Sequence, residues 1–367
     1  MKIQFAGLIQ RFAFCAGIAV ALSGCVHLKQ RLPVRVPLPL PDVLQAQISY
    51  TNHVPRVLHS QLVFVGDTFK VYFFYLESFV PEYGTNKVLT LESWIPNDAT
   101  NADSVLDLPV SAGKEYPLER WFLGEHFAHL GYVFILLHRE DYKGVDPEDH
   151  PELLNLAFAQ SIRDECRVID WIQTRSECNP KHIASIGISM GAIKNALLGA
   201  VEPRVRASVL VLGGADIASI LAHSKEGSWQ TQPSIKKKER QPWWVWDRPH
   251  KKVEINPYLC RGITARREKY MEKHHMTRAQ FEQWVRDANI VWDPKNIGKY
   301  ADPSKFCIIG GFCDNVVPFR NGMILRKEYG YPDTHILPVG HYTSALLLWY
   351  IEDVAHKFFQ EKFKEVR

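Results

Sequence analysis

The sequence lacks the features that mark several broad classes of protein. Its 367 residues carry a net charge of only +4, which argues against a nucleic-acid-binding protein. No segment repeats with a period of 20 to 50 residues, so a solenoid or propeller is not expected. The N-terminal apolar run, Phe12 to Leu22, is too short for a comfortable transmembrane helix. With 46% hydrophobic and 23% charged residues, the chain has the composition of an ordinary globular protein.

Cysteine is scarce as well, and none of the seven cysteines has zinc-ligand spacing. Cys15 and Cys25 belong to the N-terminal segment, and the remaining five are Cys166, Cys178, Cys260, Cys307 and Cys313. An odd number in an oxidising compartment leaves at least one thiol without a disulfide. Cys166 and Cys178 could pair if a helix folds back over a loop, so the pairing stays open and no disulfide is predicted.

The N-terminus has the pattern of a targeting segment. Lys2 and Arg11 supply positive charge before and beside the apolar run, which ends in Leu22-Ser23-Gly24-Cys25. These four residues resemble the lipobox of bacterial lipoproteins, which implies a lipid on Cys25 and a place in the cell envelope. The alternatives are an ordinary signal peptide or an uncleaved anchor. Val26 after the cysteine favours the outer membrane or its periplasmic face in a Gram-negative cell.

The remaining chain divides into a tether, a core and an insertion. Pro33, Pro37, Pro39 and Pro41 favour an extended backbone, so residues after the cysteine are expected to form a tether. Strand-like and helix-like segments then alternate, which predicts an α/β fold with a mainly parallel sheet and helices on both faces. The expected organisation is a signal peptide (1–25), a Pro-rich tether (26–57), a core (58–216 and 304–367) and a lid (217–303).

The core elements are expected from their apolar patterns. The expected strands are 58–65, 70–76, 87–95, 104–110, 132–137, 183–186, 207–212 and 306–310, and the expected helices are 118–130, 152–174, 192–200 and 344–362. The lid is expected to be mostly helical. Thr277 and Gln280 form a capping-box pattern for a helix over 277–289. Trp243, Trp244 and Trp246 could line a pocket or pack the lid on the core.

The strongest chemical signal is Gly187-Ile188-Ser189-Met190-Gly191. This Gly-x-Ser-x-Gly pattern follows an apolar strand and precedes a helix, as in a nucleophile elbow. A serine hydroxyl needs a base within hydrogen-bond reach and an acid to orient that base. Asp314 after one expected strand and His341 after another supply them, in the order Ser, Asp, His. Asp216 is an alternative acid.

These stretches resemble the α/β-hydrolase superfamily, in particular the dienelactone hydrolase, prolyl oligopeptidase and acetyl-xylan esterase types. The resemblance spans about residues 60–365 apart from 217–303. It implies that Ser189 is the nucleophile, His341 the base, Asp314 the orienting acid, and the backbone N–H of Met190 one oxyanion donor. The second donor would be the backbone N–H of Val110 or Ser111, where the usual His-Gly is replaced.

No metal or organic cofactor is implied. His126 and His129 have helical spacing for a metal, yet no third ligand is evident in the sequence. The expected activity is cleavage of a carboxylic ester through an acyl-enzyme. The expected substrate is a small-molecule, glycan or lipid ester. A peptidase of prolyl-oligopeptidase type and a non-catalytic envelope binding or assembly module on a hydrolase fold are the alternatives.

Overall fold

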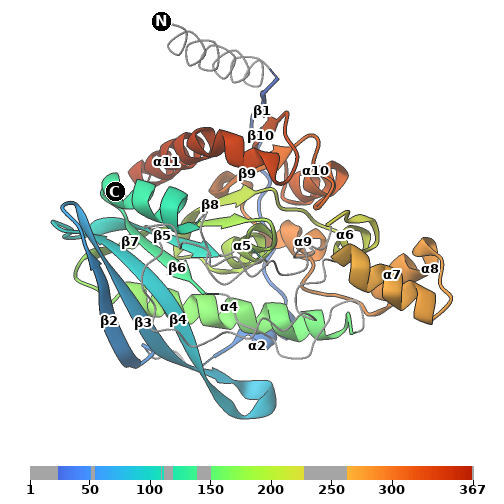
Figure 1. Cartoon of the computed structure of the whole chain (residues 1–367), viewed down its shortest axis with the longest axis horizontal. Helices are drawn as coiled ribbons and strands as arrows, with labels where there is room; N and C mark the ends of the chain where they lie inside the picture. The colour runs from blue at the N-terminus through green and yellow to red at the C-terminus, as the bar shows by residue number, and fades with distance from the viewer. Residues whose placement is uncertain are drawn as a thin grey trace, which may run out of the picture.

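The structure is a computed structural model, and it describes residues 24–50, 54–108, 110, 119–138, 150–226 and 263–365. A ten-stranded sheet forms the centre, in the order β1-β10-β9-β8-β7-β5-β6-β4-β3-β2, with helices packed around it (Figure 1). The strands are β1 (Val26–Leu28), β2 (Val57–Val65), β3 (Phe69–Val80), β4 (Thr85–Pro96), β5 (Ala102–Leu108), β6 (Val133–Leu137), β7 (Cys178–Ile188), β8 (Val205–Val211), β9 (Phe306–Gly311) and β10 (Asp333–Leu337).

The middle of the sheet is parallel, as predicted. Strands β6, β5, β7, β8, β9 and β10 run in one direction, while β2, β3 and β4 on one side and β1 on the other are antiparallel to their neighbours. The parallel strands are buried on both faces, which explains why β6 reads as a continuous apolar run. Because the carboxyl ends of these strands share one edge, loops that leave there converge.

The helices cover both faces of the sheet. Their bounds are α2 (Asp42–Ile48), α3 (Glu125–His129), α4 (Leu153–Ile172), α5 (Met190–Val201), α6 (Ile217–His223), α7 (Ile263–Lys273), α8 (Arg278–Asp287), α9 (Pro294–Ile297), α10 (Phe319–Glu328) and α11 (Leu348–Lys364). Side chains of α4 and α5 join one buried apolar cluster, and side chains of α3 and α11 join a second. Residues 119–124, expected to begin an α-helix, form a π-helical turn before α3.

Residues 26–48, expected to belong to a tether, pack on the body of the protein and do not form a free linker. Strand β1 pairs with β10, the N–H of Arg31 donates to the carbonyl of Tyr331, and the Arg35 guanidinium donates to two carbonyls on the body. Helix α2 then packs against α4. Prolines prevent regular structure but leave side chains and most backbone groups available, and the open edge of β10 offers hydrogen bonds to a short strand.

The expected signal segment lies outside the described residues up to residue 23. In the part of the chain that the structure describes, no helix combines the length and apolar character needed to cross a bilayer. The cysteines in this part form no disulfide, and Cys166 and Cys178 are buried thiols.

The segment expected to be a lid is helical where it is described, at 217–226 and 263–303. The capping box at Thr277 and Gln280 is confirmed, since each side chain accepts a hydrogen bond from the other residue's backbone N–H. The C-terminal part of this segment belongs to the core of the protein. Phe281, Trp292 and Ile297 are fully buried in the apolar cluster that includes α4. The tryptophans 243, 244 and 246 lie outside the described residues.

Candidate active site

Ser189 lies on a sharp turn between β7 and α5. Its backbone has φ 59° and ψ −117°, a conformation that non-glycine residues rarely adopt. The turn forms because Gly187 and Gly191 meet without side chains: a β-carbon at Gly187 would lie 2.4 Å from the carbonyl carbon and oxygen of Gly191. The Ser189 N–H donates to the carbonyl of Val211 on the next strand at 2.8 Å. The strained residue is therefore held by the sheet on one side and by the helix on the other.

The structure brings Ser189, His341 and Asp314 into one hydrogen-bonded line. The hydroxyl oxygen of Ser189 lies 3.0 Å from Nε2 of His341, and Nδ1 of His341 lies 2.8 Å from Oδ2 of Asp314. Asp314 follows β9 and His341 follows β10, so both loops leave the carboxyl edge of the sheet. Both side chains are largely buried, which shields this line from water and strengthens its electrostatics.

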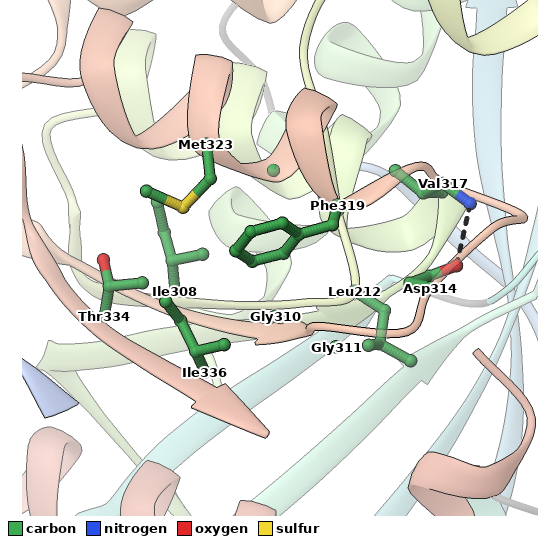
Figure 2. Close-up of a pocket in the computed structure, with 12 residues that line it drawn as sticks. Leu212, Ile308, Gly310, Gly311, Asp314, Val317, Phe319, Met323, Thr334 and Ile336 are labelled. Atoms are coloured by element: carbon green, nitrogen blue, oxygen red, sulfur yellow. Dashed lines mark hydrogen bonds between the residues drawn. The ribbon is translucent and has the colours of Figure 1, made fainter. Parts of the chain in front are cut away.

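The carboxylate of Asp314 is oriented by its own loop. Its Oδ1 accepts hydrogen bonds from the N–H groups of Val316 and Val317 at 2.9 and 3.1 Å, so Oδ2 is left to face His341. Figure 2 shows the bond from Val317. Behind it lies an apolar pocket of about 20 Å³, between β9 and the start of α10, lined by Ile308, Phe319 and ten other residues. This volume holds a water-sized guest at most. The pocket is therefore part of the support behind Asp314 and is too small for a substrate.

The backbone N–H groups expected as oxyanion donors differ in whether they are already hydrogen-bonded. Met190 is the first residue of α5, where a backbone N–H has no partner within the helix. The N–H of Val110, by contrast, donates to Oε1 of Glu119 at 3.2 Å. The expectation for Val110 is thus wrong for this conformation, because its N–H is already used. Ser111, the other candidate, lies outside the described residues.

A buried carboxyl cluster beside Val110 was missed by the sequence interpretation. Asp107 on β5 is fully buried, and neither of its carboxyl oxygens has a hydrogen-bond partner among the described residues. Burial, with Glu119 nearby, raises the pKa of Asp107 well above its usual range, and burial also raises the pKa of Glu119. The alternation of β5 places Asp107 inside, but an acid in a buried strand gives no signal from sequence alone.

The third acid in this region, Glu92, is an ionised carboxylate paired with a cation. Burial alone would raise the pKa of Glu92, but hydrogen bonds from His138 and Arg120 hold it below its ordinary value. Nε2 of His138 lies 2.6 Å from Glu92, and the Arg120 guanidinium binds the same carboxylate. Because His138 directly follows β6, this ion-pair cluster stands at the same carboxyl edge of the sheet as Ser189.

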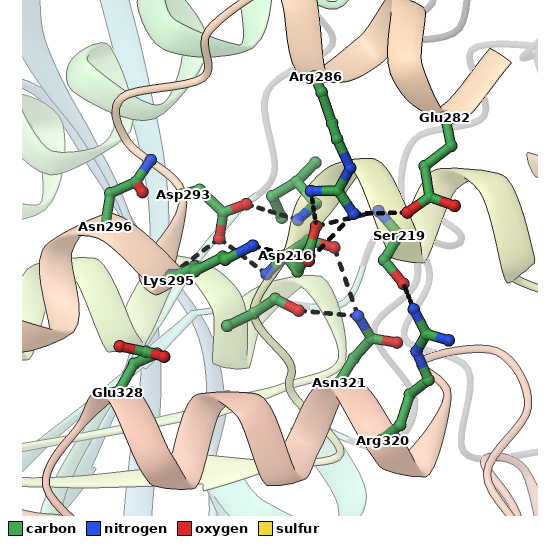
Figure 3. A network of polar contacts seen from close by, with 12 residues as sticks. Asp216, Ser219, Glu282, Arg286, Asp293, Lys295, Asn296, Arg320, Asn321 and Glu328 are labelled. Atoms are coloured by element: carbon green, nitrogen blue, oxygen red, sulfur yellow. Dashed lines mark hydrogen bonds and ion pairs between the residues drawn. The ribbon is translucent and has the colours of Figure 1, made fainter. Parts of the chain in front are cut away.

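His341 bonds to Asp314, whereas Asp216, the alternative acid, pairs with two cations. Its carboxylate accepts hydrogen bonds from Arg286 at 2.9 Å and from Lys295 at 3.0 Å (Figure 3). Burial alone would raise its pKa, but these two cations hold the pKa of Asp216 below its usual value. Asp293 accepts from the N–H groups of Asp216 and Ile217. The expectation for Asp216 is wrong as a triad acid: it caps α6 and ties α8 and α9 to the core.

His126 and His129, which have helical spacing for a metal, do not share a ligand site among the described residues. His126 lies 3.6 Å from Glu352 and His129 contacts Thr68, so the pair points to different partners. Within the described ranges, no three His, Cys, Asp or Glu side chains gather as metal ligands. Cys25 is partly exposed next to the cluster under α11, and burial raises the pKa of its thiol.

Comparison with known proteins places this fold. The most similar solved structures include acetyl xylan esterase 1 from Thermoanaerobacterium sp. JW/SL YS485, with 13% identity, a TM-score of 0.60 and coverage of 92% of this chain and 100% of that one. An acetyl xylan esterase from Paenibacillus sp. R4 has 16% identity, a TM-score of 0.53 and coverage of 85% and 92%. At these identities the likeness shows the fold, which is that of the α/β-hydrolases. No curated protein sequence matches the chain.

The family comparison is more specific. The model of one family matches residues 94–328, more than half of the chain, and these residues include Ser189 and Asp314. Together with the fold, this match supports a serine hydrolase. The chain belongs to the family described as X-Pro dipeptidyl-peptidase (S15 family), within the α/β-hydrolase superfamily.

Proposed function

We propose that this protein cleaves a carboxylic ester through an acyl-enzyme formed on Ser189. The single observation that carries the proposal is the hydrogen-bonded line from Ser189 through His341 to Asp314. It has the distances that a nucleophile, a general base and an orienting acid require. The strained turn that carries Ser189 adds support, since such backbone strain gathers at functional sites.

In this mechanism the Ser189 oxygen bonds to the acyl carbon while His341 Nε2 accepts the hydroxyl proton. Asp314 stabilises the imidazolium that forms. The N–H of Met190, at the positive end of α5, faces the developing oxyanion. His341 then gives its proton to the leaving alcohol as the ester C–O bond breaks. Water, deprotonated by His341, attacks the acyl-enzyme, releases the acid and restores the serine.

The test uses the full chain with p-nitrophenyl acetate and a fluorophosphonate probe. Wild type should turn over the ester and become labelled, and Ser189→Ala should do neither while melting like wild type. Ser185→Ala is the matched control, because Ser185 lies on the same strand but bonds to Ser208 inside the sheet at 2.9 Å. If Ser189→Ala is labelled as strongly as wild type, the nucleophile is wrong.

A peptidase is the second candidate, and the family match favours it. An amide requires the same acyl-enzyme, but His341 must protonate a more basic leaving amine. The two acetyl xylan esterases, whose similarity extends over nearly the whole chain, favour the ester. Ala-Pro-p-nitroanilide decides between them: turnover of this substrate at a higher kcat/KM than any short ester would make the protein a peptidase.

We also propose that Cys25 is lipidated and holds the protein in the bacterial cell envelope. The support is the lipobox-like sequence Leu22-Ser23-Gly24-Cys25 after an apolar run with flanking positive charge. Radiolabelled palmitate should enter wild type and should not enter Cys25→Ser. Cys313→Ser is the control, since its exposed thiol lies far along the sequence from this motif.

A further inference from the structure

The position of Cys25 in the fold is set by strand register. Strand β1 is antiparallel to β10, and Val26 pairs with Ile336. Cys25 therefore lies beside the carboxyl end of β10. That strand ends at Leu337, and His341 follows in the loop after it. Figure 1 shows β1 beside β10 at the top of the view. A lipid on Cys25 would thus leave the protein at the edge of the sheet that carries Ser189, Asp314 and His341.

No flexible linker separates Cys25 from this edge. Strand β1 begins at the next residue, and the proline-containing segment after it runs back along the body. The ring of His27 stacks on that of His335 at 4.2 Å, and Nδ1 of His335 lies 2.8 Å from the hydroxyl of Tyr350 on α11. The anchor point is consequently fixed relative to the catalytic loops, so an attached membrane would face them.

The loops at this edge expose large apolar side chains. We use the name mouth surface for Phe312, Tyr342, Leu346 and Trp349, which are 62%, 50%, 68% and 46% exposed. Phe312 is two residues from Asp314, and Tyr342 is adjacent to His341. Phe312 packs on Phe319 and Trp349 on Tyr350, yet large parts of all four side chains remain exposed, and exposed apolar surface of this kind marks interaction sites.

Hydrogen bonds hold these loops together. The N–H of Phe312 donates to the carbonyl of Leu337, and that of Cys313 donates to the carbonyl of Val339. The hydroxyl of Ser344 donates to the carbonyl of His341 at 2.6 Å, which ties the turn carrying Leu346 to the catalytic loop. The mouth surface is thus built on the same supports as the triad.

We infer that the mouth surface contacts the phospholipid bilayer to which Cys25 holds the protein, and that the substrate is the acyl ester of a lipid in that bilayer. The inference rests on the proposed esterase activity and anchor. Tryptophan and tyrosine favour the boundary between lipid and water, and leucine and phenylalanine favour the acyl region. A lipid ester leaving the bilayer at this surface would reach Ser189 without crossing open water.

The experiment uses full-length protein in vesicles of phosphatidylethanolamine and phosphatidylglycerol. Two esters are compared in the same sample: soluble 4-methylumbelliferyl butyrate and the oleate ester embedded in the vesicles. The test variant is Leu346→Ser with Trp349→Ser, which leaves the triad and its loops intact. The control is Leu58→Ser with Leu62→Ser, two similarly exposed leucines on β2 at the opposite edge of the sheet.

The test variant should lose about tenfold in turnover of the embedded ester, the order expected when large apolar contacts with a membrane are removed. Its turnover of the soluble ester should stay within about twofold of wild type, and the control should keep both activities. Equal losses on the two esters, or no loss on either, would overturn the inference. The inference would also be overturned if wild-type protein separated from the vesicles and was recovered in the aqueous fraction.

Amide hydrogen exchange supplies a readout that needs no activity. Residues 312–314 and 342–350 should exchange more slowly in vesicle-bound wild type than in dissolved Cys25→Ser, while β2 should not change. Unchanged exchange at these residues would refute bilayer contact. If wild type hydrolyses neither ester, the proposed esterase function fails and the lipid substrate falls with it, whereas bilayer contact is still decided by exchange.

Discussion

Gly187→Ala tests whether the active site depends on the contact between β7 and α5. The added β-carbon would lie 2.4 Å from the carbonyl of Gly191, where carbon atoms need about 3.5 Å, so strand and helix must separate by about 1 Å. All three atoms that it would meet within 3 Å belong to the backbone, which cannot rotate away. Overpacking of this kind costs about 1–3 kcal/mol of unfolding free energy. A displacement of about 1 Å at the nucleophile costs on the order of 10² in rate.

Gly310→Ala is the matched control. Gly310 also lies in a parallel strand of the same sheet, and a β-carbon there would meet nothing within 4 Å. Thermal melting and kcat/KM on p-nitrophenyl acetate should show a lower melting temperature and a large activity loss for Gly187→Ala only. If Gly187→Ala melts and turns over like Gly310→Ala, the close approach does not shape the site.

Four further predictions concern acidic side chains. Asp314→Asn should lower kcat by about 10⁴ with little change in melting, because it removes the carboxylate that orients His341. Asp216→Asn should keep fluorophosphonate labelling but melt lower, because Arg286 and Lys295 both lose their ion pair with this buried carboxylate. Equal kinetic losses in the two variants would contradict this assignment. Glu165 is fully buried, and burial raises its pKa to about 8. Its protonated form is therefore favoured by folding, so stability is lost as pH rises from the unfolded pKa toward 8. Glu165→Gln should melt close to wild type at pH 5 and increasingly above it by pH 9, and a constant difference across this range would refute the shift. Glu119→Ala should reduce kcat with KM little changed, because it removes the oxygen that accepts the hydrogen bond from the Val110 N–H, and unchanged kcat would show that this bond has no part in the reaction.

The sequence did not predict helices α2 and α10 or strand β1. Helix α2 and strand β1 lie among prolines, and α10 has weak apolar periodicity. Their stability comes from tertiary contacts, such as β1 on the open edge of β10, which no local pattern encodes. The buried strands β6 and β7 and the long helix α4 were predicted because their burial imposes a continuous or periodic apolar pattern.

For the site, the sequence by itself determined the residue types and their order. Gly187, Ser189 and Gly191 define the turn through the absence of side chains, and this local requirement is visible as a pattern. The sequence also indicated that Asp314 and His341 follow strands of a parallel sheet, whose carboxyl ends must share an edge.

Only the tertiary structure separated the preferred acid, Asp314, from its alternative, Asp216. Asp314 and Asp216 both follow buried strands, and they differ in what surrounds them: His341 for the first, Arg286 and Lys295 for the second. The use of the Val110 N–H by Glu119 and the position of Cys25 at the catalytic edge depend in the same way on pairings between distant segments. Such contacts are selected by packing and charge over the whole fold, and they leave no trace in local sequence spacing.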